Sequence, residues 1–191
     1  GGLDAFRGSV APGLIALIPC DVATYDEINP ATGEILWITD PLESGERADR
    51  EAFIRNIAQH PVIEHHRVTG DSRPRTFSDF LSPRGFHATA LYDEFFRPLE
   101  IEAQLAGLFH GPTPAIVGVS LNRDRRDFSD RDRLVLELAQ SYLGLAYEAV
   151  LARTRAQQML GLLGDQGSGA GAGIALLAGD GRVDAASPGT L

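Results

Sequence analysis

The sequence contains no lysine, so all 17 of its basic residues are arginines. Acidic residues outnumber them at 26, which gives a formal net charge of −9. Affinity for the phosphate backbone of nucleic acids comes mainly from cationic side chains. The negative charge therefore argues against DNA binding by this chain alone.

Cysteine is almost absent as well, because Cys20 is the single thiol. One cysteine excludes an internal disulfide and a cysteine metal cage. No run approaches the ~18 consecutive apolar residues of a membrane-spanning helix, and no charged-then-apolar leader with a cleavage site is present. We therefore expect a cytoplasmic protein without a membrane partner. Because Gly1 replaces an initiator methionine, we expect the chain to be part of a longer protein.

Leucine, isoleucine, valine and phenylalanine together supply about 27% of the residues, above the ~20% below which charged chains tend to stay disordered. A core is therefore expected, in one domain with an appendage. Apolar spacing predicts strands at Cys20–Ile28, Ile35–Thr39, Pro74–Phe80, Ile101–His110 and Ala115–Asn122. It predicts helices at Phe6–Ile18 (one helix, or two divided at Pro12), Asp49–His60, Ser82–Phe96 and from Ser129 onward.

Two local signals support these boundaries. Asn29-Pro30-Ala31-Thr32-Gly33 predicts a hairpin turn, because proline presets φ and glycine supplies positive φ. Ser129, with acidic residues in the turn that follows, predicts the N-cap of the last helix.

The last helix carries an unusual apolar pattern. From Tyr142 onward, apolar or small residues recur at steps of three and four, which is the seam spacing of a coiled coil. Packing against the chain's own sheet would explain the first half equally well. Beyond about Ala149 the stripe is narrow and polar residues surround it, so we expect a homodimer seam formed by Tyr142, Leu145, Ala149, Ala152, Ala156 and Met159.

Six of the 13 residues from 161 to 173 are glycine, which predicts a flexible linker after a domain of residues 1–160. A dinucleotide-binding glycine loop would have to follow a strand and open a helix, whereas these glycines follow a helix. Residues 174–191 resemble a second hairpin turning at Asp180-Gly181, or the start of a PAS-like segment.

No arrangement with catalytic or metal-binding spacing is found, so we expect neither an enzyme nor a cofactor. His60, His65 and His66 do not match the HExxH spacing, and we expect them to be exposed at a helix end and in a loop. Cys20 has no neighbouring histidine in the sequence. The charge run Asn122–Arg133 holds five arginines and four aspartates, which predicts a solvated turn or, alternatively, an edge for partner docking.

Aromatic residues from the predicted strands and the helix between them could instead form a small-molecule pocket. Such pockets are mostly apolar with a few polar anchors. The alternative is that the rings only fill the core. The residues expected to contact a ligand are Tyr25, Trp37, Phe77, Tyr92, Phe96 and Gln104.

Four segments resemble a known family: PCDVATYDEINPATGEILWITDP (19–41), HPVIEHHRVTGDSRPRTFSDFLS (60–82), LYDEFFRPLEIEAQL (91–105) and VGVSLNRDRRDFSDRDRLVLELAQ (117–140). They are similar to the GAF-like sensor domains that precede a LuxR-type helix-turn-helix in actinobacterial transcriptional regulators. The last segment is the most specific, because these regulators commonly carry an LNR…RDFSERDR stretch there. The resemblance covers roughly residues 3–155.

The resemblance implies an α+β fold, with a central antiparallel sheet of five or six strands, flanking helices and a long C-terminal helix. It implies a sensory and dimerising role in transcription, with DNA contacted only through a helix-turn-helix outside this sequence. GAF relatives bind cyclic nucleotides, tetrapyrroles, haem or other metabolites, and many bind no known ligand. The alternative function is a ligand-free dimerisation or protein-interaction module.

Overall fold

The computed structural model describes residues 2–29, 32–110, 116–165, 175–177 and 183–186. At its centre is a five-stranded antiparallel sheet in the order β2–β1–β5–β4–β3. This confirms the predicted α+β fold. The strands are β1 (Val22–Asn29), β2 (Glu34–Asp40), β3 (Arg75–Thr76), β4 (Ala103–His110) and β5 (Ile116–Arg123).

The predicted hairpin joins β1 and β2, with Ile28 paired to Ile35. Gly33 has a φ of +73°, and its N–H donates to the carbonyl oxygen of Asn29 at 2.8 Å. Glycine adopts this left-handed conformation without the steric penalty of a Cβ atom. Residues 30–31 of the turn lie outside the described part of the chain.

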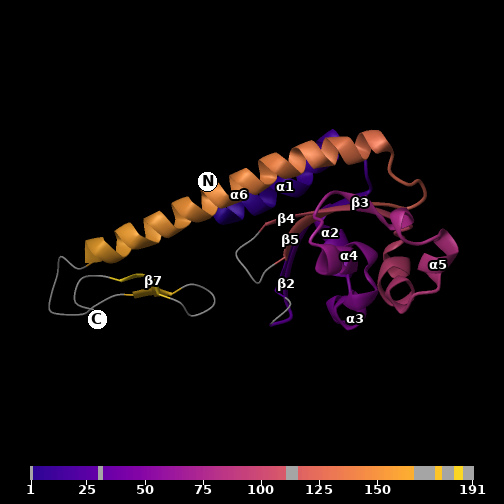
Figure 1. Cartoon of the computed structure of the whole chain (residues 1–191), viewed down its shortest axis with the longest axis horizontal. Coiled ribbons are helices and arrows are strands. Elements are labelled where there is room, and N and C mark those ends of the chain that lie inside the picture. Colours follow the sequence, from indigo (N-terminus) through magenta and orange to yellow (C-terminus); the bar gives the residue numbers. More distant parts are fainter. Residues whose placement is uncertain (1, 30–31, 111–115, 166–174, 178–182, 187–191) are drawn as a thin grey trace.

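Two long helices cover one face of the sheet (Figure 1). They are α1 (Leu3–Leu17) and α6 (Asp130–Asp165), which contact each other along this face. Leu14 from α1 and Leu136 from α6 are buried against Tyr25 and Leu121 of the sheet. Side chains alternate between the two faces of a strand, so Leu121 and its apolar neighbours in β5 face these helices while the residues between them face the opposite layer.

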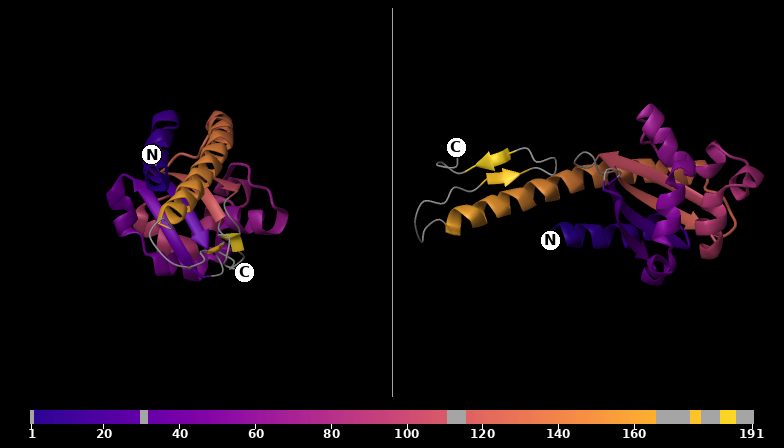
Figure 2. Two further views of the ribbon diagram at one scale, coloured as in Figure 1. Left: turned by 90° about the vertical axis from the view of Figure 1, so that its left-hand side faces the viewer. Right: turned by 90° about the horizontal axis from the view of Figure 1, so that it is seen from below.

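Short helical segments cover the second face (Figures 1 and 2). Phe77, Phe86, Leu91 and Phe96 form a second core there. The segments are α2 (Leu42–Arg47), α3 (Arg50–Asn56), α4 (Pro61–Thr69), α5 (Pro83–His87), the π-helical turn η3 (Tyr92–Phe96) and the 3₁₀ turns η1 (Ile57–Gln59), η2 (Phe77–Asp79) and η4 (Arg97–Leu99).

Several predicted boundaries change in this second layer. The strand predicted at Pro74–Phe80 is reduced to Arg75–Thr76, because Thr76 and Asp79 form a capping box that starts η2. The helix predicted through Phe96 ends at His87, and the π-helical turn follows it. Both differences arise where local side-chain hydrogen bonds replace the expected backbone pattern.

The two long helices agree more closely with the prediction. α1 is one continuous helix rather than two, although Pro12 lies inside it. Pro12 has no N–H to donate to the carbonyl oxygen of Gly8, four residues earlier. Both residues are exposed, so water can donate a hydrogen bond to that carbonyl oxygen. Ser129 caps α6 as predicted, since its Oγ accepts a hydrogen bond from the Asp132 N–H at 3.3 Å.

α6 extends beyond the sheet at its C-terminal end (Figures 1 and 2). By length and composition alone, the stretch Asp130–Met159 would be able to cross a membrane. However, Leu136 and Tyr147 in this stretch are 0% and 2% exposed in the core beneath the helix. One side of the first half of α6 therefore packs in the core of the domain.

The C-terminal region is described only in part. α6 continues to Asp165, five residues into the segment predicted as a linker, and residues 166–174 lie outside the described part. β6 (Ala175–Leu177) and β7 (Val183–Ala186) pair antiparallel, in line with the second predicted hairpin. Its expected turn at 180–181 is not described.

The burial of α6 leads to a stability prediction. Leu136→Ala should lower the free energy of unfolding by about 2–5 kcal/mol, because it leaves a cavity in a closed core. The matched control is Leu134→Ala on the same helix, where the side chain is 57% exposed; it should change stability by less than about 0.5 kcal/mol. Urea unfolding measures both, and equal effects would contradict this packing of α6.

Candidate functional site

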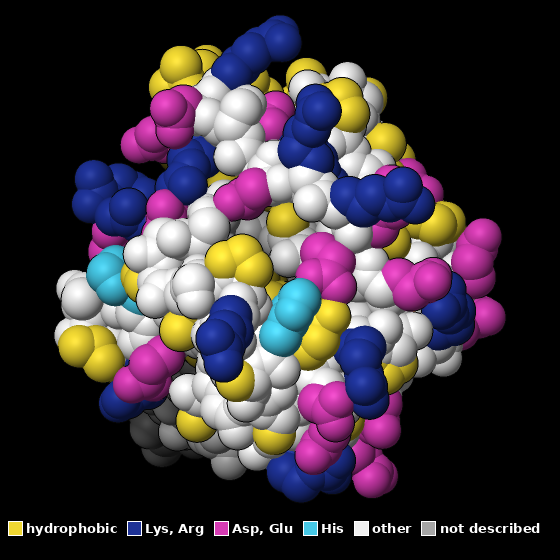
Figure 3. All heavy atoms as spheres, turned by 90° about the vertical axis from the view of Figure 1, so that its right-hand side faces the viewer, with side chains coloured by type: hydrophobic (Ala, Val, Ile, Leu, Met, Phe, Trp, Pro, Cys, Tyr) yellow, Lys and Arg dark blue, Asp and Glu magenta, His cyan; other side chains and the backbone are white. Residues whose placement is uncertain are grey.

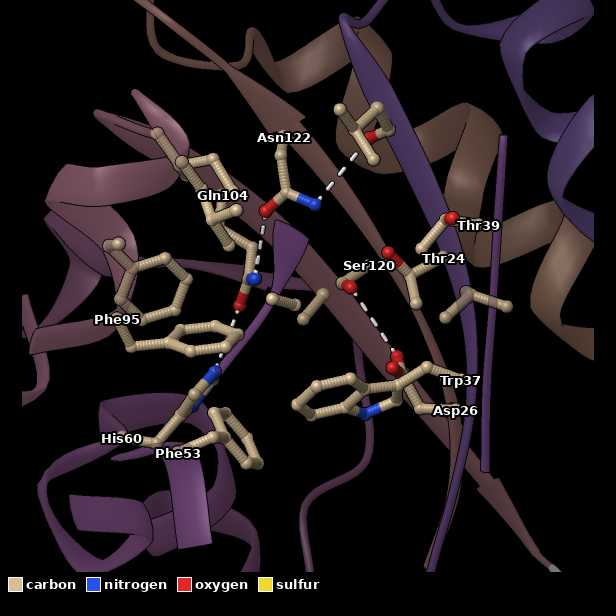
Figure 4. Close-up of a pocket in the computed structure, with 18 of the residues that line it drawn as sticks. Thr24, Asp26, Trp37, Thr39, Phe53, His60, Phe95, Gln104, Ser120 and Asn122 are labelled. Carbon is tan, nitrogen blue, oxygen red and sulfur yellow. Dashed lines mark hydrogen bonds between the residues drawn. The ribbon is translucent and has the colours of Figure 1, made fainter. Parts of the chain in front are cut away.

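A cavity lies between the second face of the sheet and the short helical segments (Figure 4). Its volume is about 90 Å³, measured as the space open to the centre of a water-sized sphere. One water needs only about 10–15 Å³ on this measure. The cavity therefore has room for several waters or for a small organic molecule.

The sheet side of the cavity changes from apolar to polar in successive cross-strand rows. Ile28 pairs with Ile35 and Ile116 in the first row, and Asp26 pairs with Trp37 and Gly118 in the second. The third row carries hydroxyl groups, from Thr39, Thr24 and Ser120. The fourth row carries side-chain amides, from Asn122 and Gln104. An occupant would meet apolar groups at one end and hydrogen-bonding groups at the other.

The opposite wall is aromatic. Phe53 comes from α3, and Phe95 comes from the π-helical turn η3. The ring centroids of Trp37 and Phe53 lie 5.2 Å apart in an edge-to-face arrangement, and those of Phe53 and Phe95 lie 5.0 Å apart. These rings hold one another by contacts of a kind worth about 0.5–1.5 kcal/mol beyond burial.

A chain of hydrogen bonds crosses the polar end of the cavity (Figure 4). Neutral His60 donates from Nε2 to Gln104 Oε1 at 3.0 Å, and Gln104 Nε2 donates to Asn122 Oδ1 at 2.9 Å. Asn122 Nδ2 then donates to the carbonyl oxygen of Val22 at 3.4 Å. In the neutral ring the proton is on Nε2, because Nδ1 accepts a hydrogen bond from the Ile63 N–H at 3.4 Å.

The structure corrects the prediction that His60 is exposed at a helix end. Its side chain is 4% exposed and lines the cavity, because Pro61 begins α4 instead of only ending the preceding helix. Proline is favoured at the first helical position, which makes His60 the N-cap. Burial lowers the pKa of His60 to about 4, although its bond to Gln104 opposes the shift.

Asp26 is the second ionisable group that lines the cavity. Its Oδ2 accepts a hydrogen bond from Ser120 Oγ at 3.3 Å. Desolvation raises the pKa of Asp26 to about 7, because this one long hydrogen bond compensates little for the lost water. The carboxyl group therefore changes charge near neutral pH.

Three of the six predicted contact residues line this cavity: Trp37, Phe96 and Gln104. Tyr25 lies on the other face of the sheet, in the core beneath α1 and α6, so the prediction that it shares the pocket is wrong. Adjacent residues of a strand point to opposite faces, and Thr24 rather than Tyr25 faces the cavity.

Phe77 and Tyr92 lie in the second core but not along the cavity. The ring of Phe77 packs 4.6 Å from that of Phe86, and so fills the core as the alternative interpretation expected. Tyr92 donates its hydroxyl to Glu102 Oε1 at 2.6 Å and stacks on His87 at 4.2 Å.

Among the described residues, no group of three or more His, Cys, Asp or Glu side chains is arranged to hold a metal ion. Cys20 packs beside the core beneath α1 and α6, and burial raises the pKa of its thiol to about 11. A thiol that stays protonated at neutral pH is a poor nucleophile. The cavity itself combines a carboxyl group and a neutral imidazole with aromatic walls, which suits binding.

The charge run 122–133 forms a structural junction on the surface. The Arg123 guanidinium donates to the carbonyl oxygen of Pro19 and lies 3.9 Å from the centroid of the Phe128 ring. On the end face seen in Figure 3, blue and magenta side chains are interspersed without a large patch of one sign. A nucleic-acid surface would be predominantly basic.

No known sequence family and no curated protein sequence matches the chain. Solved structures do match. The ligand-binding domain of VqsR from Pseudomonas aeruginosa is similar with a TM-score of 0.58 and 16% identity, over 78% of this chain and 90% of that one. The GAF domain of a two-component sensor histidine kinase from Bacillus halodurans has a TM-score of 0.53 and 13% identity, over 80% and 98%.

GAF3 from Slr1393 of Synechocystis is also similar, with a TM-score of 0.53 and 19% identity, over 79% of this chain and 97% of that one. The fold is GAF-like. It is shared by the GAF domain of the sensor histidine kinase and by the ligand-binding domain of VqsR. At these identities the similarity concerns the fold alone.

The two ionisable cavity groups lead to a pH prediction. The pKa of Asp26 is raised in the folded state, so its contribution to stability is lost as pH rises from about 4 to about 7. The pKa of His60 is lowered, so its contribution is lost as pH falls from about 6.5 to about 4. Between these limits the two effects oppose each other.

Asp26→Asn should therefore gain stability relative to the native chain as pH rises from about 4 to about 8, by at most roughly 4 kcal/mol at 1.36 kcal/mol per pKa unit. His60→Gln should show the opposite slope below about pH 6.5. Urea unfolding over this pH series measures both. Parallel profiles for the native chain and Asp26→Asn would contradict the raised pKa of this carboxyl group.

Proposed function

We propose that this chain is the ligand-sensing and dimerisation domain of a helix-turn-helix transcriptional regulator of the LuxR type. Three lines of support converge. The sequence resembles such domains over residues 3–155, the fold is shared with the ligand-binding domain of VqsR, and the cavity offers polar anchors inside aromatic walls. The cavity is the observation that carries the proposal.

Strand β1 offers a direct route from the cavity to the long helices. Asp26 faces the cavity, while its neighbours Tyr25 and Glu27 face the other layer. The Arg7 guanidinium of α1 donates to both carboxylate oxygens of Glu27 at 2.7 Å, and the Tyr25 hydroxyl donates to the same carboxylate at 2.6 Å. Phe6, in α1, packs its ring on both Tyr25 and Tyr147 of α6.

In this proposal a ligand shifts the domain between two arrangements for which its affinity differs. Movement of β1 at Asp26 changes how Tyr25 and Glu27 meet α1 and α6. The exposed end of α6 then passes the change to a DNA-binding part outside this sequence. The regulator acts in the cytoplasm, and the domain itself performs no catalysis.

The predicted dimer seam lies on a side of α6 where the described part of the chain leaves the side chains exposed. Tyr142, Leu145 and Met159 are 73%, 67% and 36% exposed. The alanines of the seam, Ala149, Ala152 and Ala156, are also exposed. From 142 to 159 the stripe is about 26 Å long at 1.5 Å per residue. Its alternating steps of three and four suit an equivalent helix from a second copy.

Native mass spectrometry of the chain purified from its source tests ligand sensing. We expect a retained small-molecule mass that is released on denaturation. Ser120→Leu, which places a larger side chain in the cavity, should lack this mass while keeping a cooperative thermal transition. A native chain without any retained mass would favour the alternative function, a ligand-free dimerisation or protein-interaction module.

Sedimentation velocity tests the dimer seam. Leu145→Glu should shift the chain from dimer to monomer, because a carboxylate replaces an apolar side chain within the interface. Gln157→Glu is the control, since it adds the same charge to α6 outside the seam. A monomeric native chain, or equal effects of the two substitutions, would contradict the seam.

A further inference from the structure

We propose that the cavity binds a small organic ammonium ion, with Asp26 as its anionic anchor and the indole ring of Trp37 beside the charge. This inference rests on the proposed function, because it names the ligand class of the same cavity. Figure 4 shows both side chains on the sheet side of the cavity, across from Phe53, His60 and Phe95.

Asp26 lacks the partners that accompany other carboxylates of this protein. Within the described residues, the long bond from Ser120 is its one recorded hydrogen bond, and no arginine or histidine forms an ion pair with it. Asp71, in contrast, pairs with both Arg73 and Arg75. A carboxylate accepts several hydrogen bonds when it is ionised, so Asp26 retains acceptor capacity that the described residues do not use.

Asp26 lines the cavity between two cross-strand partners. Its partner on β2 is Trp37, and its partner on β5 is Gly118, over which the side chain of Leu108 packs. Directly opposed side chains on one sheet face lie about 4.5–5.5 Å apart at Cβ. A group bound to the carboxylate would therefore also meet the indole.

The charges around Asp26 favour a cation as the occupant. His60 is neutral and its N–H is donated to Gln104. Among the described residues of the lining, the one cationic side chain is Arg47 of α2, which donates to the carbonyl oxygen of Pro98 at 3.2 Å. The described lining residues from β2, β4, β5, α3 and η3 include no other charged group. An ammonium ion would thus supply the counter-charge that the cavity lacks.

Trp37 is a suitable second partner. The guanidinium of Arg50 already lies 5.6 Å from the centroid of its ring, although Arg50 is not part of the cavity lining. Cations are attracted to aromatic faces within about 6 Å, most strongly to tryptophan. Phe53 and Phe95 would hold the apolar body of the ligand by contact with their rings.

Titration of Asp26 gives the proposal a distinctive pH signature. Its pKa of about 7 means that the ionised fraction grows about tenfold between pH 6 and pH 8. The pKa of His60, about 4, lies well below this range. Affinity for an ammonium ion should therefore rise about tenfold over these two pH units.

Calorimetric titration of the whole chain with three probes of one skeleton tests the inference. The probes are 2-phenylethylamine, 2-phenylethanol and phenylacetate. We expect the amine to bind at least tenfold more tightly than the other two at pH 8, and to weaken about tenfold at pH 6. The affinity of the alcohol should not show this increase with pH.

Asp26→Asn should abolish the preference for the amine and its pH dependence, while binding of the alcohol shows that the variant is folded. Glu34→Gln, which removes an exposed negative charge from β2, should leave the preference intact. Trp37→Leu should weaken the amine more than the alcohol.

Equal or tighter binding of the alcohol or of phenylacetate by the native chain would overturn the inference and leave the sensing role in place. Absence of binding by all three probes would overturn it as well. The retained-mass experiment then decides independently whether the cavity holds a ligand of another class.

Discussion

The structure depends on strand β1, because its two faces have different roles. One face forms part of the cavity wall, and the other packs against helices α1 and α6. Its even-numbered residues face the cavity and its odd-numbered residues face α1 and α6. A β-strand cannot move one face without the other, because successive side chains share one rigid backbone. Asp26 is thereby coupled to Glu27, whose ion pair with Arg7 holds α1 against the sheet.

The cavity keeps a polar interior at an energetic cost. Buried polar groups are costly unless they are hydrogen-bonded. In the hydrogen-bond chain, His60 donates to Gln104, Gln104 donates to Asn122, and Asn122 donates to a backbone carbonyl oxygen. Asp26 is the exception, because Ser120 alone donates to it among the described residues. Functional sites commonly retain such locally unfavourable groups. The proposed ammonium ligand would supply a positive charge as the partner of the Asp26 carboxylate.

Much of the fold follows from local patterns in the sequence. The hairpin at Asn29–Gly33, strands β4 and β5 and the Ser129 cap depend on residues close together in the chain, and all of them are confirmed. The site was less predictable. Alternation within β1 already separates Thr24 from Tyr25 and would have placed Thr24 and Asp26 on one face. It does not say which face borders a cavity, so the aromatic Tyr25 is also among the residues expected there.

By itself, the sequence predicted strands β1, β2, β4 and β5 and the long final helix, because these depend on periodicity, turns and caps within short segments. The antiparallel sheet was implied by the family resemblance, and helices α2 and α4 were not predicted. Only the tertiary structure decided that His60 is buried opposite Gln104 and that Asp26 lies between Trp37 and Gly118. Those positions follow from the pairing of segments up to about a hundred residues apart. Their protonation follows from the water that this pairing excludes, which no local pattern encodes.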